Sequence, residues 1–289
     1  MQNRNLLPIC ALFLATAAHA QQGDVSWRST ELAPGLYMLE GQGGFAGGNL
    51  SLVTGDDGVV LIDDGIEPVT AATVAAIDAL TGDPVDFVIN THSHGDHIGA
   101  NATLHNKGAA IVAHDNLRRR LVSEGKAKAV LPELTFSDSV TFHLNGHAAK
   151  VFHVASAHTD GDSVIHFPEV NVIHAGDVFF NGLFPFIDLD AGGSVDGFIA
   201  AQLKVLALAD DETKIVPGHG GLATRADLQA AVDMLMDARS RIAKLVDAGR
   251  SLEQVQAANP LADYHDGWNW DFITTERMTE QLYRALSSE

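Results

Sequence analysis

The alternation of hydrophobic and polar positions divides the chain into segments with the period of strands and segments with the longer period of helices. Residues 35–41 and 49–55 alternate apolar and polar positions, which predicts two half-buried antiparallel strands. Shorter apolar runs predict strands at residues 59–62, 84–90, 109–113, 140–144, 148–154, 163–167, 170–173 and 214–216. Helices are predicted at residues 67–80, 96–106, 115–124, 195–209 and 275–287. A further long helix is predicted from one apolar face, formed by Leu228, Val232, Leu235, Ala238, Ile242 and Leu245. The capping box Ser251-Leu252-Glu253-Gln254 predicts the start of another helix.

Stretches rich in strands alternate twice with helices, and neither a linker nor a low-complexity tract separates them. This order predicts an α/β (α+β) fold in which two sheets carry helices on their outer sides. The length after the first 20 residues suits one large domain, which we predict to span residues 21–289.

The first 20 residues have the pattern of a cleaved signal peptide. Arg4 is followed by an apolar stretch at residues 6–16 and by the small-x-small sequence Ala18-His19-Ala20. The apolar stretch is too short to span a membrane, so we expect no membrane insertion after removal of the leader. Cys10 is the only cysteine, so the predicted periplasmic or secreted protein would contain neither disulfides nor thiolate ligands.

The charge balance is strongly acidic. Lys and Arg total 18 against 37 Asp and Glu, which gives a formal net charge of −19. A surface of this charge repels nucleic acid and anionic lipid, so we expect a small-molecule substrate and no nucleic-acid partner. Composition does not indicate the oligomeric state.

The strongest chemical signal is a cluster of imidazoles and one carboxylate directly after the apolar run at 84–90. It comprises His92, His94, Asp96 and His97. Imidazole nitrogen and carboxylate oxygen are natural ligands of zinc and neighbouring transition metals. In an extended chain His92 and His94 face the same side, whereas the adjacent Asp96 and His97 point apart. The spacing therefore favours two neighbouring metal ions over one.

Three later residues have the same character. His158, Asp177 and His219 each occur near glycine at a predicted junction between a strand and a loop. Glycine lets the backbone approach a crowded centre closely. Each alone is typical of an ordinary polar turn, but their joint occurrence after the first cluster indicates a shared site.

The order and type of these residues resemble the metallo-β-lactamase superfamily, and the resemblance extends from about Gly35 to about Gly220. The resemblance implies a four-layer αββα sandwich with two zinc ions per chain, although iron or manganese would suit the same ligands. It further implies that Asp177 bridges the metals, that Asp96 also orients the nucleophile as a catalytic residue, and that Asp63 orients the metal-binding loop. The implied ligands are His92, His94 and His158 for one metal, and Asp96, His97 and His219 for the other.

One position departs from the β-lactamase pattern. The true β-lactamases of the superfamily generally have cysteine or serine where this chain has Asp177, and an aspartate there is more similar to glyoxalase II and lactonases. The resemblance implies an exported zinc-dependent hydrolase that uses a dimetal-bound hydroxide to cleave an amide or lactam, ester or thioester bond, with β-lactamase-like activity as the first expectation. The alternatives are a glyoxalase II-like thioesterase or lactonase and an iron-dependent dioxygenase on the same scaffold. A non-catalytic zinc-binding or partner-binding protein is a further alternative, which this cysteine-free ligand set disfavours.

Several other features allow two interpretations. The glycine-rich segment 41–48, with Phe45 at its tip, predicts either a substrate-covering flap or a simple hairpin turn. Trp268 and Trp270 are expected to pack in the core or in a lid. In the loops of the predicted site, no Lys or Arg stands out as a residue that could bind a substrate carboxylate. His174 is expected to be structural. The apolar residues after Asp177 suit a substrate pocket or the core equally: Phe179, Phe180, Leu183, Phe184 and Phe186.

Overall fold

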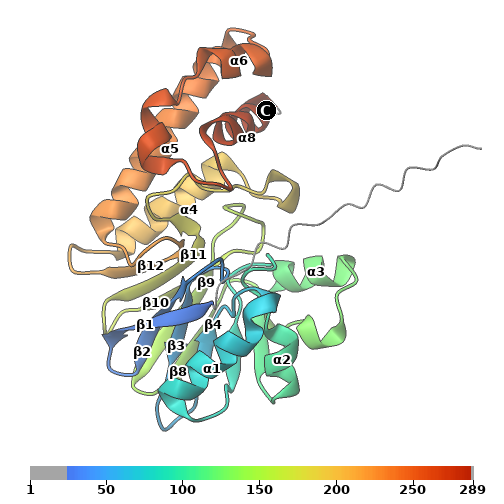
Figure 1. Cartoon of the computed structure of the whole chain (residues 1–289), viewed down its shortest axis with the longest axis vertical. Coiled ribbons are helices and arrows are strands. Elements are labelled where there is room, and N and C mark those ends of the chain that lie inside the picture. Colours follow the sequence, from blue (N-terminus) through green and yellow to red (C-terminus); the bar gives the residue numbers. More distant parts are fainter. Residues whose placement is uncertain (1–24, 288–289) are drawn as a thin grey trace, which may run out of the picture.

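Two β-sheets packed face to face form the centre of the molecule (Figure 1). The structure is a computed structural model that describes residues 25–287, so the predicted signal peptide lies outside the described residues. The first sheet has the order β1 to β7, with strands Ser26–Ala33, Leu36–Gln42, Leu50–Val53, Val60–Ile62, Phe87–Ile89, Ala110–His114 and Leu134–Phe136. The second has the order β12-β11-β10-β9-β8, with strands Lys214–His219, Val172–Phe180, Ser163–Phe167, His147–His153 and Ser139–Leu144.

Helices cover the outer faces of both sheets. Their bounds are α1 Thr70–Thr81, α2 Asn101–Asn106, α3 Asp115–Ser123, α4 Val195–Leu208, α5 Arg225–Asp247, α6 Leu252–Ala258, α7 His265–Trp268 and α8 Thr275–Ser287. Helices α1 and α2 bury Ile77 and Leu104 against the first sheet, and α4 and α5 bury Val205 and Val232 against the second. The αββα sandwich predicted from the sequence is confirmed.

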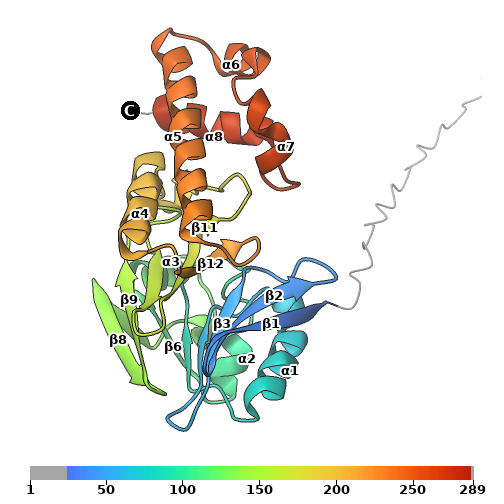
Figure 2. The ribbon, with the colours of Figure 1, turned by 90° about the vertical axis from the view of Figure 1, so that its left-hand side faces the viewer.

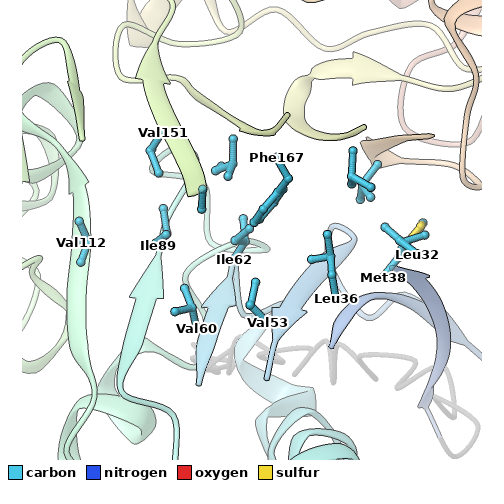
Figure 3. Packing of buried hydrophobic residues seen from close by; sticks show 14 of the residues in the cluster. Leu32, Leu36, Met38, Val53, Val60, Ile62, Ile89, Val112, Val151 and Phe167 are labelled. Carbon is cyan, nitrogen blue, oxygen red and sulfur yellow. The ribbon is translucent and has the colours of Figure 1, made fainter. Parts of the chain in front are cut away.

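The space between the sheets is filled by apolar side chains (Figure 3). Met38, Ile62 and Ile89 of the first sheet meet Val151 and Phe167 of the second, and all five are almost fully buried. Burial of this kind stabilises the fold by roughly 25 cal/mol for each Å² of apolar surface removed from water. The interior therefore holds the two sheets, and the loops at their edge, in a fixed relation.

Helix α5 extends beyond the sandwich, and α6, α7 and α8 lie beside its far part (Figure 2). Apolar residues of α5, α6 and α8, among them Leu235, Val255 and Leu282, form a separate buried cluster with the loop after β11. The capping box predicted at Ser251 and Gln254 is present at the start of α6. This packing joins the C-terminal helices to the loop that carries Phe184 and Phe186.

The structure corrects several predicted elements. The segment at 96–106 is helical only from Asn101, because the backbone before it bonds to other loops, including Gly99 N to Gly65 O at 2.9 Å. Strand β3 is buried at every position rather than on one face, since it is covered on both sides. Strand β11 continues to Phe180, past the predicted end at 173, so that Asp177 lies within a strand that has irregular register.

Candidate metal centre

The predicted ligands come together at one edge of the sandwich in two adjacent clusters. Strands β4 and β5 run parallel in the first sheet, as do β11 and β12 in the second. The loops after β4 and β5 therefore begin at one edge of the first sheet, and the segments after β11 and β12 begin at one edge of the second. Within each cluster the candidate ligand atoms lie within 4.8 Å of one another, and the clusters are His92, His94, His158 and Asp177, and Asp96, His97 and His219. All seven residues predicted from the sequence are thus in one place.

Asp177 lies at the junction of the two clusters. One carboxylate oxygen, Oδ2, is 3.7 Å from Nε2 of His92 and 3.5 Å from Nε2 of His158 in the first cluster. The same carboxylate contacts the second cluster, with Oδ1 3.1 Å from Nε2 of His97 and Oδ2 3.5 Å from Nε2 of His219. Asp96 contacts only the second cluster, 3.4 Å from His219 and 3.7 Å from His97. Asp177 is therefore the group placed to join the two clusters.

Hydrogen bonds on the outer side of His94, His97 and His158 leave the other ring nitrogen of each facing the cluster. Nδ1 of His97 donates to Asp63 Oδ2 at 2.8 Å, and Nδ1 of His158 donates to the carbonyl of Phe186 at 2.7 Å. His94 is held in the opposite sense, because Nε2 lies 2.9 Å from Asp188 Oδ2 and Nδ1 faces His158. A donor on one nitrogen fixes the other as a lone pair, which is the form that binds a metal.

These residues fit a metal ion. His92 Nε2, His97 Nε2 and Asp177 Oδ1 are buried and have no hydrogen-bond partner among the described residues, and an unpartnered buried polar atom is costly. All three atoms point to the clusters. A cation bound there would satisfy these atoms, and a donor set of nitrogen and oxygen suits zinc.

The carboxylates make this site favourable for positive charge. Burial opposes protonation of His219, but the charge and hydrogen bond of Asp177, together with Asp96, raise its pKa to about 9. Burial would raise the pKa of Asp96, but the charge of His97 and the hydrogen bond to His219 lower it to about 2. Burial lowers the pKa of His158 to about 4 despite the nearby charge of Asp177, so this imidazole is neutral at neutral pH.

Asp63 holds the metal-binding loop at its base. It is fully buried, and its carboxylate accepts hydrogen bonds from the backbone N–H and the hydroxyl of Thr91, both at 2.7 Å, in addition to the one from His97. Its φ of 54° lies in the left-handed region, which a non-glycine residue adopts at a cost of about 1–3 kcal/mol. These three hydrogen bonds to one side chain keep the start of the loop at the end of β5.

Two glycines leave the space that the ligands occupy. A Cβ on Gly48 would lie 2.1 Å from Cε1 of His97, and a Cβ on Gly218 would lie 1.9 Å from Oδ1 of Asp177. Neither position can therefore carry a side chain without moving a candidate ligand. Gly48 belongs to the glycine-rich segment after β2, whose close approach to His97 shows that this segment forms part of the site.

Asp188 is a site residue that sequence reasoning missed. It lies in the loop after β11, and its hydrogen bond to His94 spans 94 residues of sequence, so no local pattern identifies it. His174, expected to be structural, accordingly lies outside both clusters, with its Nδ1 2.8 Å from Ser51 Oγ across the sandwich. The apolar residues after Asp177 divide between the two interpretations: Phe179 and Phe184 are core, whereas Phe186 stacks against His94 with ring centroids 5.8 Å apart.

Replacing Asp188 by asparagine is expected to weaken metal binding by about 10- to 100-fold, because His94 would exchange a charged carboxylate acceptor for a neutral amide that fixes its ring nitrogen less strongly. Competition against a chromogenic zinc chelator measures this change. Asp190→Asn is the matched control, since Asp190 is an exposed aspartate of the same loop that pairs with Arg284 instead. Equal zinc affinity in Asp188→Asn and Asp190→Asn would show that Asp188 does not act through His94.

Within residues 25–287 the chain forms an αββα sandwich without cysteine, and paired clusters of histidine and aspartate lie at one edge of it. Together with the family match and the relatives given next, this site places the protein among the metal-dependent hydrolases. The sequence model of the metallo-beta-lactamase superfamily matches residues 43–219, and the chain belongs to this family. The family assignment predicted from the sequence is confirmed.

The sequence is similar to two kinds of hydrolase. A hydroxyacylglutathione hydrolase of Rhizobium meliloti (strain 1021) is 27% identical over 215 residues, which are 70% of this chain and 77% of that protein. A type 2 metallo-beta-lactamase of Bacteroides fragilis is 27% identical over 144 residues, 50% of this chain and 56% of that protein. The solved structure of a metallo-beta-lactamase from Pontibacter korlensis has a TM-score of 0.62 at 19% identity, covering 73% of this chain and all of that one. This last likeness concerns the fold.

Proposed function

We propose that the protein is an exported hydrolase that binds two zinc ions and cleaves an amide or lactam, ester or thioester bond, with β-lactamase-like activity. The observation that carries this proposal is the arrangement of seven candidate ligands in two clusters joined through Asp177. Two adjacent groups of ligands around one shared carboxylate suit a pair of metals, and a ligand set without cysteine argues against a purely structural zinc site.

The proposed roles follow the two clusters. His92, His94 and His158 would hold one zinc ion, Asp96, His97 and His219 the other, and Asp177 would contact both. Bound zinc supplies a water of lowered pKa and polarises a carbonyl oxygen. Iron or manganese would find acceptable ligands in the same atoms.

The protein groups then position the reactants. Asp96 is ionised at neutral pH and is only partly buried, so its carboxylate can accept a hydrogen bond from an attacking water and orient it. Asp63 and Asp188 hold the rings of His97 and His94 in place through their outer nitrogens. Such preorganisation reduces the rearrangement needed as charge develops on the substrate oxygen.

Export is proposed from the leader-like sequence at residues 1–20. Among residues 25–287, no helix combines the length and the hydrophobicity that a membrane span requires. The acidic charge of the chain supports a small-molecule substrate over nucleic acid.

A second candidate function is a thioesterase or lactonase of the glyoxalase II kind. It is favoured by the aspartate at position 177, and the resemblance to the Rhizobium meliloti hydroxyacylglutathione hydrolase covers more of this chain than that to the Bacteroides fragilis lactamase. The scaffold is the same for both functions, so the substrate is decided by the walls of the site.

The test is a side-by-side assay of the zinc-loaded protein, with measured metal content, on a chromogenic cephalosporin, a lactone, a thioester and a phosphodiester. We expect hydrolysis of the cephalosporin that is lost with a chelator and restored by zinc. Turnover of only the lactone or thioester would favour the second candidate. Loaded protein that hydrolyses none of the first three substrates, or that consumes oxygen with iron, would contradict the proposal.

A further inference from the structure

Aromatic side chains from three separate segments lie beside the metal centre, where three of them contact one another in a row and the fourth, Phe45, joins the row through the ring of His219. We call Phe45, Trp270, Phe272 and Phe186 the aromatic arc. The ring of Trp270 lies 5.5 Å from that of Phe272, which in turn lies 5.4 Å from that of Phe186. The two ends of the arc meet candidate metal ligands on either cluster, because Phe45 and Trp270 contact His219 at 6.2 and 6.0 Å and Phe186 contacts His94 at 5.8 Å.

Two members of the arc are open to solvent. Phe45 is 50% exposed and Phe272 is 44% exposed, although both rings are in contact with other aromatic side chains. Large aromatic side chains that gather at an exposed surface mark a contact site more often than scattered single ones do. Their position next to both clusters places this surface where a substrate would lie with its reactive bond at the centre.

The segment that carries Trp270 and Phe272 is fixed to the rest of the site. The indole N–H of Trp270 donates to the carbonyl of Phe184 at 2.9 Å, and Phe184 N donates to the carbonyl of Trp268 at 2.8 Å. Asn269 caps the segment by accepting a hydrogen bond from Thr275 N at the start of α8. These hydrogen bonds hold the connection between α7 and α8 in place, where it forms one wall of the site.

Arg277, in the first turn of α8, brings a positive charge to this wall. Its guanidinium carbon lies 4.3 Å from the ring centroid of Phe272 and 5.7 Å from that of Phe186. One N–H of Nη1 donates to the carbonyl of Phe272 at 2.8 Å. Within residues 25–287, no carboxylate lies within ion-pair distance of this guanidinium, so its other donors remain for a ligand.

Resting on the proposed hydrolase function, we propose that the arc and Arg277 select an anionic substrate. Its apolar or aromatic group lies on Phe272 and Phe186, and its carboxylate pairs with Arg277 while its scissile carbonyl reaches the metal centre. A planar guanidinium held against aromatic rings suits bidentate recognition of a carboxylate. The chain as a whole repels anions with a net charge of −19, so binding of such a substrate requires a local cation of this kind.

The test compares two substrates that differ only in charge, a chromogenic cephalosporin with a free carboxylate and its methyl ester, on the zinc-loaded full chain. In Arg277→Gln we expect KM for the carboxylate to rise about tenfold, and KM for the ester to change less than about twofold, because only the carboxylate loses a charged hydrogen bond. We expect the zinc content and kcat to stay unchanged and Arg277→Lys to restore part of the affinity. In the wild type, added salt should reduce the difference between KM for the carboxylate and KM for the ester, because salt screens the charge of Arg277.

Arg250→Gln is the matched control, because it removes the same charge from an exposed arginine that lies between α5 and α6, outside the site. It should leave both KM values unchanged. Equal effects of Arg277→Gln on the two substrates, or no effect on either, would overturn the role of Arg277 while leaving the hydrolase function in place. A loaded wild type that hydrolyses neither substrate, nor any other in the assay above, would overturn both proposals.

Discussion

In the Asp177→Asn variant, kcat is expected to fall on the order of 10³-fold, equivalent to about 4 kcal/mol of transition-state stabilisation. Asparagine keeps the shape of the side chain but removes the negative charge, and Asp177 is the carboxylate that contacts imidazoles of both clusters. Without that charge the two metals would lose their shared ligand and the screening between them. We expect the bound zinc to fall from two equivalents to one or fewer, as measured by elemental analysis of the purified variant.

Asp162→Asn is the control for Asp177→Asn, because it replaces a buried carboxyl group outside the two clusters. Asp162 is equally buried but belongs to neither cluster, and burial raises its pKa to about 7 against the hydrogen bonds from Thr159. This group is therefore partly protonated at neutral pH, and a neutral amide replaces it with little electrostatic change. Full activity and two zinc ions in Asp177→Asn would contradict the assignment of Asp177.

The Gly218→Ala variant is expected to lose activity on the order of 100-fold and about 1–3 kcal/mol of stability. The added Cβ would lie 1.9 Å from Oδ1 of Asp177 and 2.7 Å from the backbone of Gly176, so the carboxylate or its strand must shift. A shift of this size displaces a group on which both clusters depend. Steady-state kinetics and thermal unfolding of the zinc-loaded variant measure the two effects.

Gly221→Ala is the control for this substitution. Gly221 lies three residues further along the same segment, has no positive φ, and a Cβ there would meet nothing within 4 Å. We expect wild-type activity and an unfolding temperature within about 2 °C, since a surface substitution usually changes stability by less than about 0.5 kcal/mol. Equal loss in both variants would mean that the segment tolerates no side chain for reasons other than contact with Asp177.

The parts of the fold that the sequence predicts well are those with strong local signals. Strand β10 and helix α8 have the predicted bounds, because one is a buried apolar run and the other is a periodic terminal helix. Strand β1 was not predicted, since most of its residues are exposed and carry no apolar alternation. Strand β7 was missed because two of its three residues are exposed, so it lacks the buried apolar run that marks the equally short β4 and β5.

The candidate site shows the same division. His92, His94, Asp96 and His97 are close in sequence, so their pattern is visible before the fold is known. Asp188 contacts a ring nitrogen of His94, and Arg277 contacts the ring of Phe186, in both cases across a long separation in sequence. A single polar residue on a loop or in the first turn of a helix creates no periodic pattern, so only the arrangement in space indicates what it contacts. Substrate preference depends on residues of this second kind.

We propose that the seven residues of the two clusters together hold a pair of metal ions. Native mass spectrometry of the folded protein after incubation with zinc tests it most directly, because the mass of each chain reports how many ions it binds. We expect a chain with two zinc ions, and the loss of at least one ion in His94→Ala. A chain that is folded by circular dichroism yet keeps its metal-free mass in excess zinc, or binds only one ion, would contradict it.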